Sequence, residues 1–186
     1  MKKILSIFII VLLTNGFSSC EKDDICDADT DTTPRLMIQF YDYTNPEVPK
    51  NVTKLKVIAE GQENGIVFNA AAIGDLKYIT SGNEIAVPLN TTADSVKYSF
   101  ILNYGDANPD LVFTDTLQFN YSRQTIYVSR ACGYKIIFSL NDNPDLDNPY
   151  VLNDDPVATQ GNWIQGISIE QYNLTTENET HLKIYF

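Results

Sequence analysis

Basic residues are scarce in this chain of 186 residues: 13 Lys and Arg accompany 24 Asp and Glu, and the net charge at pH 7 is −11. Binding to phosphate groups needs clustered basic side chains. We therefore expect no nucleic-acid partner, and no binding to an anionic membrane through charge. The segment YSRQTIYVSRACGYK is an exception, because Arg123, Arg130 and Lys135 surround a predicted strand there. They indicate either a contact with a partner or ion pairs with surface acids, and ion pairs are the more common case.

Histidine is almost absent, since His181 is the one histidine in the chain. A zinc site needs several Cys or His ligands, and a Ser/His/Asp site would have to use His181. This histidine precedes Leu182 and Ile184 on the predicted last strand, in an alternation that indicates an exposed strand histidine. Solvated surface acids explain the many carboxylates more simply than a glycosidase pair does. We predict no catalytic residue, no metal and no cofactor, and a protein that is not an enzyme.

Long hydrophobic runs are also missing, and the run at residues 4–13 (ILSIFIIVLL) has ten positions. Ten residues rise about 15 Å as a helix, roughly half the hydrocarbon thickness of a bilayer, so a stable transmembrane span is not expected. With Lys2 and Lys3 before it and mainly small or polar residues after it, this run is typical of an export signal. We predict a signal peptide over residues 1–19.

Cys20 follows Ser18 and Ser19, and this arrangement resembles the signal of a bacterial lipoprotein, in which the cysteine becomes the lipidated first residue after cleavage. Phe17 departs from that pattern, which usually has an aliphatic residue at this position. The alternative is ordinary secretion, with Cys20 as a free or paired thiol. If the resemblance holds, several acyl chains attach the protein firmly to the membrane.

Charged residues directly follow the predicted lipidation site. Lys22, Asp23 and Asp24 resemble the surface-export signal of Bacteroidota lipoproteins. The alternative is a solvated charged tether, since short charge runs usually have that role. Both are compatible with a lipidated acidic tether over residues 20–34.

Cysteine is rare as well, with three in the chain. If Cys20 carries lipid, Cys26 and Cys132 remain, and in an exported protein an even remainder predicts a disulfide. The bond would close a loop of about 105 residues and would stabilise the fold by roughly 4–5 kcal/mol in the chain-entropy model. A thiol site would need a nearby histidine, and His181 lies near the other end of the chain.

The body of the chain predicts β structure throughout. Apolar residues alternate with other residues in short runs, separated by turn sequences such as EGQENG and YGDANPD at intervals of roughly 8–15 residues. No segment sustains a helical period, and residues 69–73 could form one turn at most. We therefore predict a single antiparallel β-sandwich of Ig-like type over residues 35–186, with about nine or ten strands. The runs begin at Leu36, Leu55, Ile85, Val96, Leu111, Leu117, Tyr134, Ile167 and Leu182.

Two acidic segments contain incomplete calcium motifs. Residues 27–33 (DADTDTT) place Asp27, Asp29 and Asp31 at alternating positions, but they lack the Gly and the closing Glu that a calcium loop needs. Residues 141–161 form a long acidic loop that is equally incomplete as a motif, and long loops are often functional or mobile. We predict no defined metal cage, and leave cation binding by the 141–161 loop open.

Tryptophan occurs once, and Trp163 borders the long acidic loop. An exposed indole at this place could stack on a sugar or a peptide. The alternative is a core aromatic residue, because Phe, Tyr and Trp usually fill the interior of a sandwich. A core position is therefore the more common case, and Trp163 stays a candidate partner contact beside Arg123 and Arg130.

Four segments stand out together: CEKDDIC, TPRLMIQFYD, NYSRQTIYVSRACGYKIIF and HLKIYF. They resemble a family of small Bacteroidota outer-membrane lipoproteins without an assigned activity. The resemblance implies a lipid-anchored β-domain in the outer membrane, exposed on the cell surface or otherwise on the periplasmic face. It implies an accessory subunit beside a β-barrel or an assembly protein, and no catalytic residue. A glycan- or peptide-binding module at the cell surface is the alternative.

Two sites resemble the O-glycosylation signal of the same bacterial group, an acid followed by a hydroxyl residue and an apolar residue. They are Asp94-Ser95-Val96 and Asp115-Thr116-Leu117.

Overall fold

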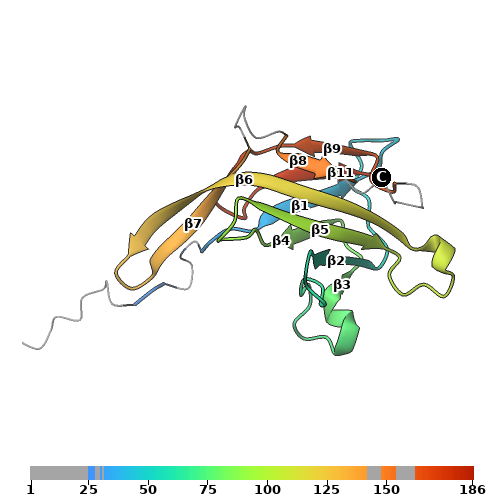
Figure 1. Cartoon of the computed structure of the whole chain (residues 1–186), viewed down its shortest axis with the longest axis horizontal. Helices are drawn as coiled ribbons and strands as arrows, with labels where there is room; N and C mark the ends of the chain where they lie inside the picture. The colour runs from blue at the N-terminus through green and yellow to red at the C-terminus, as the bar shows by residue number, and fades with distance from the viewer. Residues whose placement is uncertain (1–24, 28–29, 31, 142–147, 154–161) are drawn as a thin grey trace, which may run out of the picture. The chain divides into compact units, whose positions relative to one another are not determined.

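The computed structural model describes residues 25–27, 30, 32–141, 148–153 and 162–186. The chain divides into two compact units, a smaller one of residues 1–30 and 126–135 and a larger one of residues 31–125 and 136–186. The elements, labelled as in Figure 1, are β1 (Leu36–Tyr41), β2 (Leu55–Ala59), the 3-10 helix η2 (Gly74–Tyr78), β3 (Ile79–Thr80), β4 (Glu84–Val87), β5 (Ser95–Leu102), the 3-10 helix η3 (Pro109–Leu111), β6 (Phe113–Ser129), β7 (Gly133–Leu140), β8 (Tyr150–Leu152), β9 (Gly166–Ile169), β10 (Asn173–Leu174) and β11 (Leu182–Tyr185).

Two sheets make up the sandwich. One has the strand order β4-β1-β11-β9, and the other has the order β10-β7-β6-β5-β2-β3, with β8 paired to β6. β1 and β11 are parallel, with Ile38 beside Leu182 and Phe40 beside Ile184. Their outer neighbours β4 and β9 are antiparallel to them, and β5 is antiparallel to both β2 and β6.

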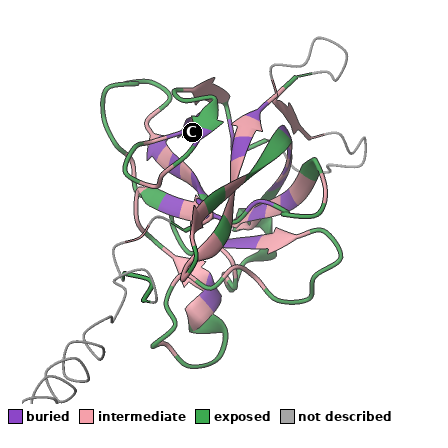
Figure 2. Cartoon of the chain, turned by 90° about the vertical axis from the view of Figure 1, so that its left-hand side faces the viewer, coloured by how far each residue is buried: buried purple, intermediate pink, exposed green. Residues whose placement is uncertain are grey.

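Alternation along the strands builds the core. Leu36, Ile38 and Phe40 on β1 are fully buried, as are Leu117 and Phe119 on β6. Figure 2 shows the resulting change between buried and partly exposed positions along the strands. Because strands of both sheets contribute to one apolar cluster, the predicted all-β sandwich is confirmed.

The strands differ from the prediction at several places. The runs expected from Leu111 and from Leu117 are one strand, because Leu111 ends η3 and β6 begins at Phe113. β6 continues to Ser129, eight residues beyond Tyr121, where the apolar alternation fades. β3, β8 and β10 have two or three residues each, too few to show a period in the sequence. The 3-10 helix η2 follows the single turn that was expected at residues 69–73.

Candidate interaction surfaces

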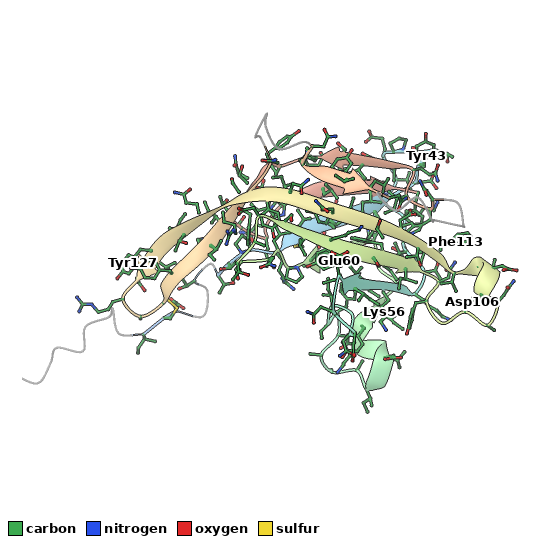
Figure 3. The ribbon with its side chains drawn as sticks, in the orientation of Figure 1. Tyr43, Lys56, Glu60, Asp106, Phe113 and Tyr127 are labelled. Carbon is green, nitrogen blue, oxygen red and sulfur yellow. A yellow bond between two sulfur atoms is a disulfide. The ribbon has the colours of Figure 1, made fainter. Side chains whose placement is uncertain are left out.

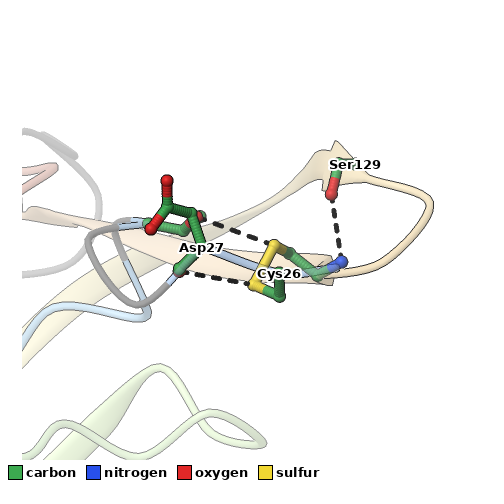
Figure 4. Close-up of a disulfide and its surroundings, with 5 residues drawn as sticks. Cys26, Asp27 and Ser129 are labelled. Carbon is green, nitrogen blue, oxygen red and sulfur yellow. Dashed lines mark hydrogen bonds between the residues drawn. A yellow bond between two sulfur atoms is a disulfide. The ribbon is translucent and has the colours of Figure 1, made fainter. Parts of the chain in front are cut away.

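The disulfide between Cys26 and Cys132 lies in the smaller unit, with 4.9 Å between the two Cα atoms (Figure 4). It confirms the cysteine pair predicted from the sequence. Cys132 belongs to the turn between β6 and β7, where its backbone N–H donates a 3.0 Å hydrogen bond to Ser129 Oγ. Gly133 follows with a φ of 71°, a conformation that glycine adopts without strain and that is common after a turn of this length. The bond therefore joins the acidic tether to the turn of a hairpin.

Large apolar side chains are exposed in this same unit. Ile25, Tyr127 and Tyr134 form what we call the tip group, and they are 82%, 57% and 70% exposed. The two tyrosine rings contact each other edge to face, with 5.3 Å between their centroids. Figure 3 labels Tyr127 on β6. Tyr127 was not singled out in the sequence, and Tyr134 was expected to begin a run of residues that face the core. Both are exposed because these ends of β6 and β7 lie in the smaller unit, whereas the residues of the buried cluster belong to the larger one.

Arg123 makes an ion pair within the larger unit. Its Nε atom lies 2.7 Å from Asp94 Oδ1, and its Nη1 atom donates a hydrogen bond to the backbone oxygen of Thr91 at 2.6 Å. This agrees with the ion-pair alternative stated for the basic segment. Arg130 is exposed on the turn of the smaller unit.

Trp163 lies in the core and not on a binding face. Its side chain is 7% exposed, and its Nε1 atom donates a 3.1 Å hydrogen bond to the backbone oxygen of Phe100. The indole packs edge to face on Phe186, with 5.4 Å between ring centroids, and also contacts Phe40. The hypothesis of a partner contact through Trp163 is corrected accordingly, because an indole enclosed in this way offers almost no surface.

His181 is fully buried, which corrects the expectation of an exposed strand histidine. It lies directly before β11, next to β1, and its Nδ1 atom accepts a 2.9 Å hydrogen bond from the backbone N–H of Met37. Nε2 has no hydrogen-bond partner among the described residues. Burial lowers the pKa of His181, although Glu179 and Glu177 act in the opposite direction. The local alternation predicted that the His181 side chain faces solvent. It is buried instead, and it is hydrogen-bonded to the backbone of the neighbouring strand β1.

Several predicted sites lie outside the described residues. They are Cys20, Lys22, Asp23 and Asp24 near the predicted anchor, together with Asp29, Asp31 and most of the acidic loop. Among the residues that the structure does describe, no group of three or more His, Cys, Asp or Glu side chains could hold a metal ion. In that same part of the chain, no helix is long and apolar enough to cross a membrane.

A second exposed apolar group lies on the segment between β2 and β3. Val67, Ile73 and Leu76, which we call the loop group, are 50%, 88% and 67% exposed. The three alanines at 70–72 lie between them. Apolar residues are not expected to be this exposed over one short segment unless they contact something else.

Backbone hydrogen bonds give the loop group a defined conformation. Phe68 and Asn69 both donate their N–H groups to the backbone oxygen of Lys77, at 2.9 and 3.1 Å. The side chain of Asn69 in turn accepts from Ala71 N–H at 3.1 Å. Upstream, Ile66 N–H donates to Val57 on β2 at 2.8 Å. The loop therefore presents its apolar side chains from a fixed backbone.

A buried lysine supports the base of this loop. Lys56 on β2, labelled in Figure 3, is 6% exposed. Its Nζ atom donates a 3.0 Å hydrogen bond to the hydroxyl of Tyr104. The same ammonium lies 4.1 Å from the centre of the Tyr104 ring and 5.7 Å from that of Tyr78, the last residue of η2. The faces of aromatic rings stabilise a cation that has left water. Lys56 thus joins the strand to the end of the loop.

Two hollows lie among the described residues of the larger unit. One, of about 380 Å³, is lined by Asn148, Pro149, Tyr150, Ile167, Ile169 and Tyr172. The other, of about 340 Å³, has a lining of mainly polar residues that includes Asp94, Ser95 and Asn120. The first has aromatic walls, since Tyr150 and Tyr172 both contribute to it.

Comparison with curated proteins and with solved structures gives no match. A family model matches residues 54–186, a range that includes the loop group, both tip tyrosines and Cys132. The chain therefore belongs to the family of unknown function DUF6452.

Proposed function

We propose that this protein is a non-enzymatic lipoprotein of the outer membrane, held by lipid on Cys20 and exposed on the cell surface, where it is an accessory subunit of an outer-membrane protein complex. Lipid attachment is supported by the short apolar run and by Ser18-Ser19-Cys20 after it. The signal-like residues Lys22 and Asp23-Asp24 support export to the surface. The proposal assigns no catalytic residue.

The observation that supports a protein partner is the loop group. Val67, Ile73 and Leu76 are exposed on a backbone that hydrogen bonds hold in one conformation. A rigid apolar surface loses little conformational entropy when a partner covers it. Each aliphatic side chain that becomes fully buried contributes about 1.5–3 kcal/mol. Such a surface suits the lateral contact of an accessory subunit.

Site-specific photo-crosslinking in native membranes tests the partner. A crosslinking amino acid at Ile73, which is 88% exposed, is expected to form one defined adduct with an outer-membrane protein. The matched control is the same amino acid at Val48, which is 46% exposed on another segment of the larger unit. The doubly substituted chain Ile73→Asp/Leu76→Asp should fail to co-purify that protein. Equal crosslinking from Ile73 and Val48, or unchanged co-purification, would contradict the loop group as the contact.

Protease treatment of intact cells tests the location. Added protease is expected to cut the wild-type protein, and to spare a chain in which Lys22, Asp23 and Asp24 are all replaced by Ala. Equal cutting of both chains would leave these residues as a solvated tether. Equal sparing of both would place the protein on the periplasmic face.

The alternative of a glycan- or peptide-binding module now depends on the hollow with aromatic walls. Tyr172 is 49% exposed beside it, and an exposed ring can stack on a sugar. A glycan array read with wild-type protein and with Tyr172→Ala separates the two functions. Specific binding that Tyr172→Ala abolishes would favour this alternative.

A further inference from the structure

The tip group gathers exposed apolar surface in a small part of the chain. Ile25, Tyr127 and Tyr134 are each more than half exposed, and the two tyrosine rings already pack against each other at 5.3 Å. Large apolar side chains that remain exposed together usually mark a contact surface. This surface is separate from the loop group, which belongs to the larger unit.

The disulfide holds the members of the tip group close to one another. Ile25 is next to Cys26, and Tyr134 is two residues after Cys132. Because the Cα atoms of the two cysteines are 4.9 Å apart, Ile25 cannot move far from the hairpin turn while the bond is intact. The turn itself is closed by the hydrogen bond from Cys132 to Ser129.

The length of the chain between Cys20 and Cys26 limits how far this surface can be from a bilayer. Six residues span at most about 20 Å when fully extended. The headgroup region of one leaflet is roughly 5–8 Å thick. A lipid on Cys20 therefore keeps the tip group within a short distance of the headgroups.

We infer that the tip group docks into the headgroup region of the bilayer that holds the lipid of Cys20, as a second membrane contact beside the anchor. The inference rests on the lipid anchor of the proposed function. Tyrosine suits this location, because its ring is apolar and its hydroxyl hydrogen bonds to water or headgroups. Ile25 adds an aliphatic side chain to the same contact.

The contact is apolar in character. The full chain has 13 basic and 24 acidic residues, and removal of residues 1–19 takes away Lys2 and Lys3, so an anionic surface repels the mature chain as a whole. Vesicles of zwitterionic phosphatidylcholine are therefore the suitable probe. Binding by lipid alone would leave the smaller unit free to tilt, whereas docking of the tip group fixes which of its sides faces the bilayer.

Fluorescence quenching by brominated lipid tests the contact. Three forms of the full mature protein are compared: wild type, Tyr134→Trp and Tyr172→Trp. Each is purified from its native membrane and reconstituted into phosphatidylcholine vesicles that carry bromine on the acyl chains. Wild type supplies the background, since Trp163 is buried in the core. Tyr172→Trp, at a position that is 49% exposed in the larger unit, is the matched control. The added emission of Tyr134→Trp should fall at least twofold relative to unbrominated vesicles, and that of Tyr172→Trp should not change.

Two further measurements separate this inference from the proposed function. The mass of the purified protein reports the lipid on Cys20. A second sample is the mature Tyr134→Trp chain with a histidine tag in place of the lipid, held on nickel-chelating vesicles of the same brominated lipid. Its quenching measures the contact of the tip group in the absence of acyl chains on Cys20. Lipidated protein without quenching of Tyr134→Trp would overturn the inference and leave the anchor in place. Purified protein without lipid would contradict the proposed function. In that case, quenching of Tyr134→Trp in the tagged chain would still support the tip contact. No quenching in the tagged chain would overturn the inference. Emission of Tyr134→Trp that shifts to the blue without quenching would assign the surface to contact between copies of the protein, and would also overturn the inference.

Discussion

The carboxylate of Asp115, on β6, accepts a 2.7 Å hydrogen bond from the backbone N–H of Ile164. Asp115 is fully buried, and its other oxygen accepts from the side-chain amide of Asn153 at 3.0 Å. Asn153 in turn exchanges hydrogen bonds with the backbone of Thr116, donating through its N–H and accepting through Oδ1, both at 2.8 Å. One acidic side chain thus holds together two residues that are eleven positions apart in the sequence.

Replacement of Asp115 should destabilise the larger unit strongly. In Asp115→Ala, the N–H of Ile164 loses its partner in a buried place and the amide of Asn153 loses its partner in a partly buried one. Each buried unsatisfied group costs about 1–3 kcal/mol. We expect the free energy of unfolding, measured by urea denaturation, to fall by about 3 kcal/mol. Asp110→Ala, at an exposed position after Pro109, is the control and should change it by less than about 0.5 kcal/mol. A loss below 1 kcal/mol for Asp115→Ala would show that the carboxylate has no such role.

Stability should decrease with acid because of His181. Burial removes the imidazole from water and so sets its folded-state pKa below the ordinary value of 6.5. Protonation would also require Nδ1 to stop accepting from Met37 N–H. Glu177, which pairs with Arg35, and Glu179 oppose this shift without reversing it. A lowered histidine pKa contributes stability that is fully present above pH 6.5 and is lost as the pH falls below it.

His181→Asn provides the comparison, because an amide oxygen can accept the hydrogen bond from Met37 without titrating. Between pH 7.5 and pH 5, the unfolding free energy of the wild type should fall more steeply than that of His181→Asn. Parallel curves would mean that His181 is not the group responsible.

The disulfide should contribute several kcal/mol. In the chain-entropy model, a closed loop of this length stabilises by about 4–5 kcal/mol, so Cys26→Ser/Cys132→Ser should unfold at a clearly lower urea concentration than the wild type. The wild type treated with reductant should match this variant, and the variant itself should be indifferent to reductant. A variant that unfolds together with the oxidised wild type would show that the bond adds no stability.

The two sequences that resemble an O-glycosylation signal should behave differently. Ser95 is exposed at the start of β5, whereas the hydroxyl of Thr116 is buried and has no hydrogen-bond partner in the described chain. We expect a sugar on Ser95 and none on Thr116 in the folded protein. Peptide mass mapping of native protein and of Ser95→Ala checks this, and a sugar found on Thr116 would contradict it.

The sequence predicted the sandwich because strict alternation is a local signal of a strand with one buried face, as on β1 and β5. It predicted the Cys26–Cys132 bond because few cysteines leave few pairings. His181 was placed wrongly, and for Trp163 the core alternative holds while the partner contact does not. Their burial depends on β1 and on Phe186 and Phe100, which are distant in the sequence. The exposure of the loop group and of Tyr127 carried no signal, because the same apolar residue types are usually buried. The alternation at Tyr134 predicted burial, which is wrong for this residue.

The central claim, a lipid on Cys20 next to a disulfide-bonded hairpin tip, is tested most directly by non-reducing peptide mapping of protein purified from its native membrane. Chymotrypsin cuts after Leu36, Tyr127 and Tyr134 but has no aromatic or leucine site between Cys20 and Cys26. We predict one species in which residues 20–36 are joined to residues 128–134, with the mass of the acyl chains on Cys20, and which reductant splits in two. The same linked species without acyl mass, or one that extends upstream of Cys20, would contradict the account.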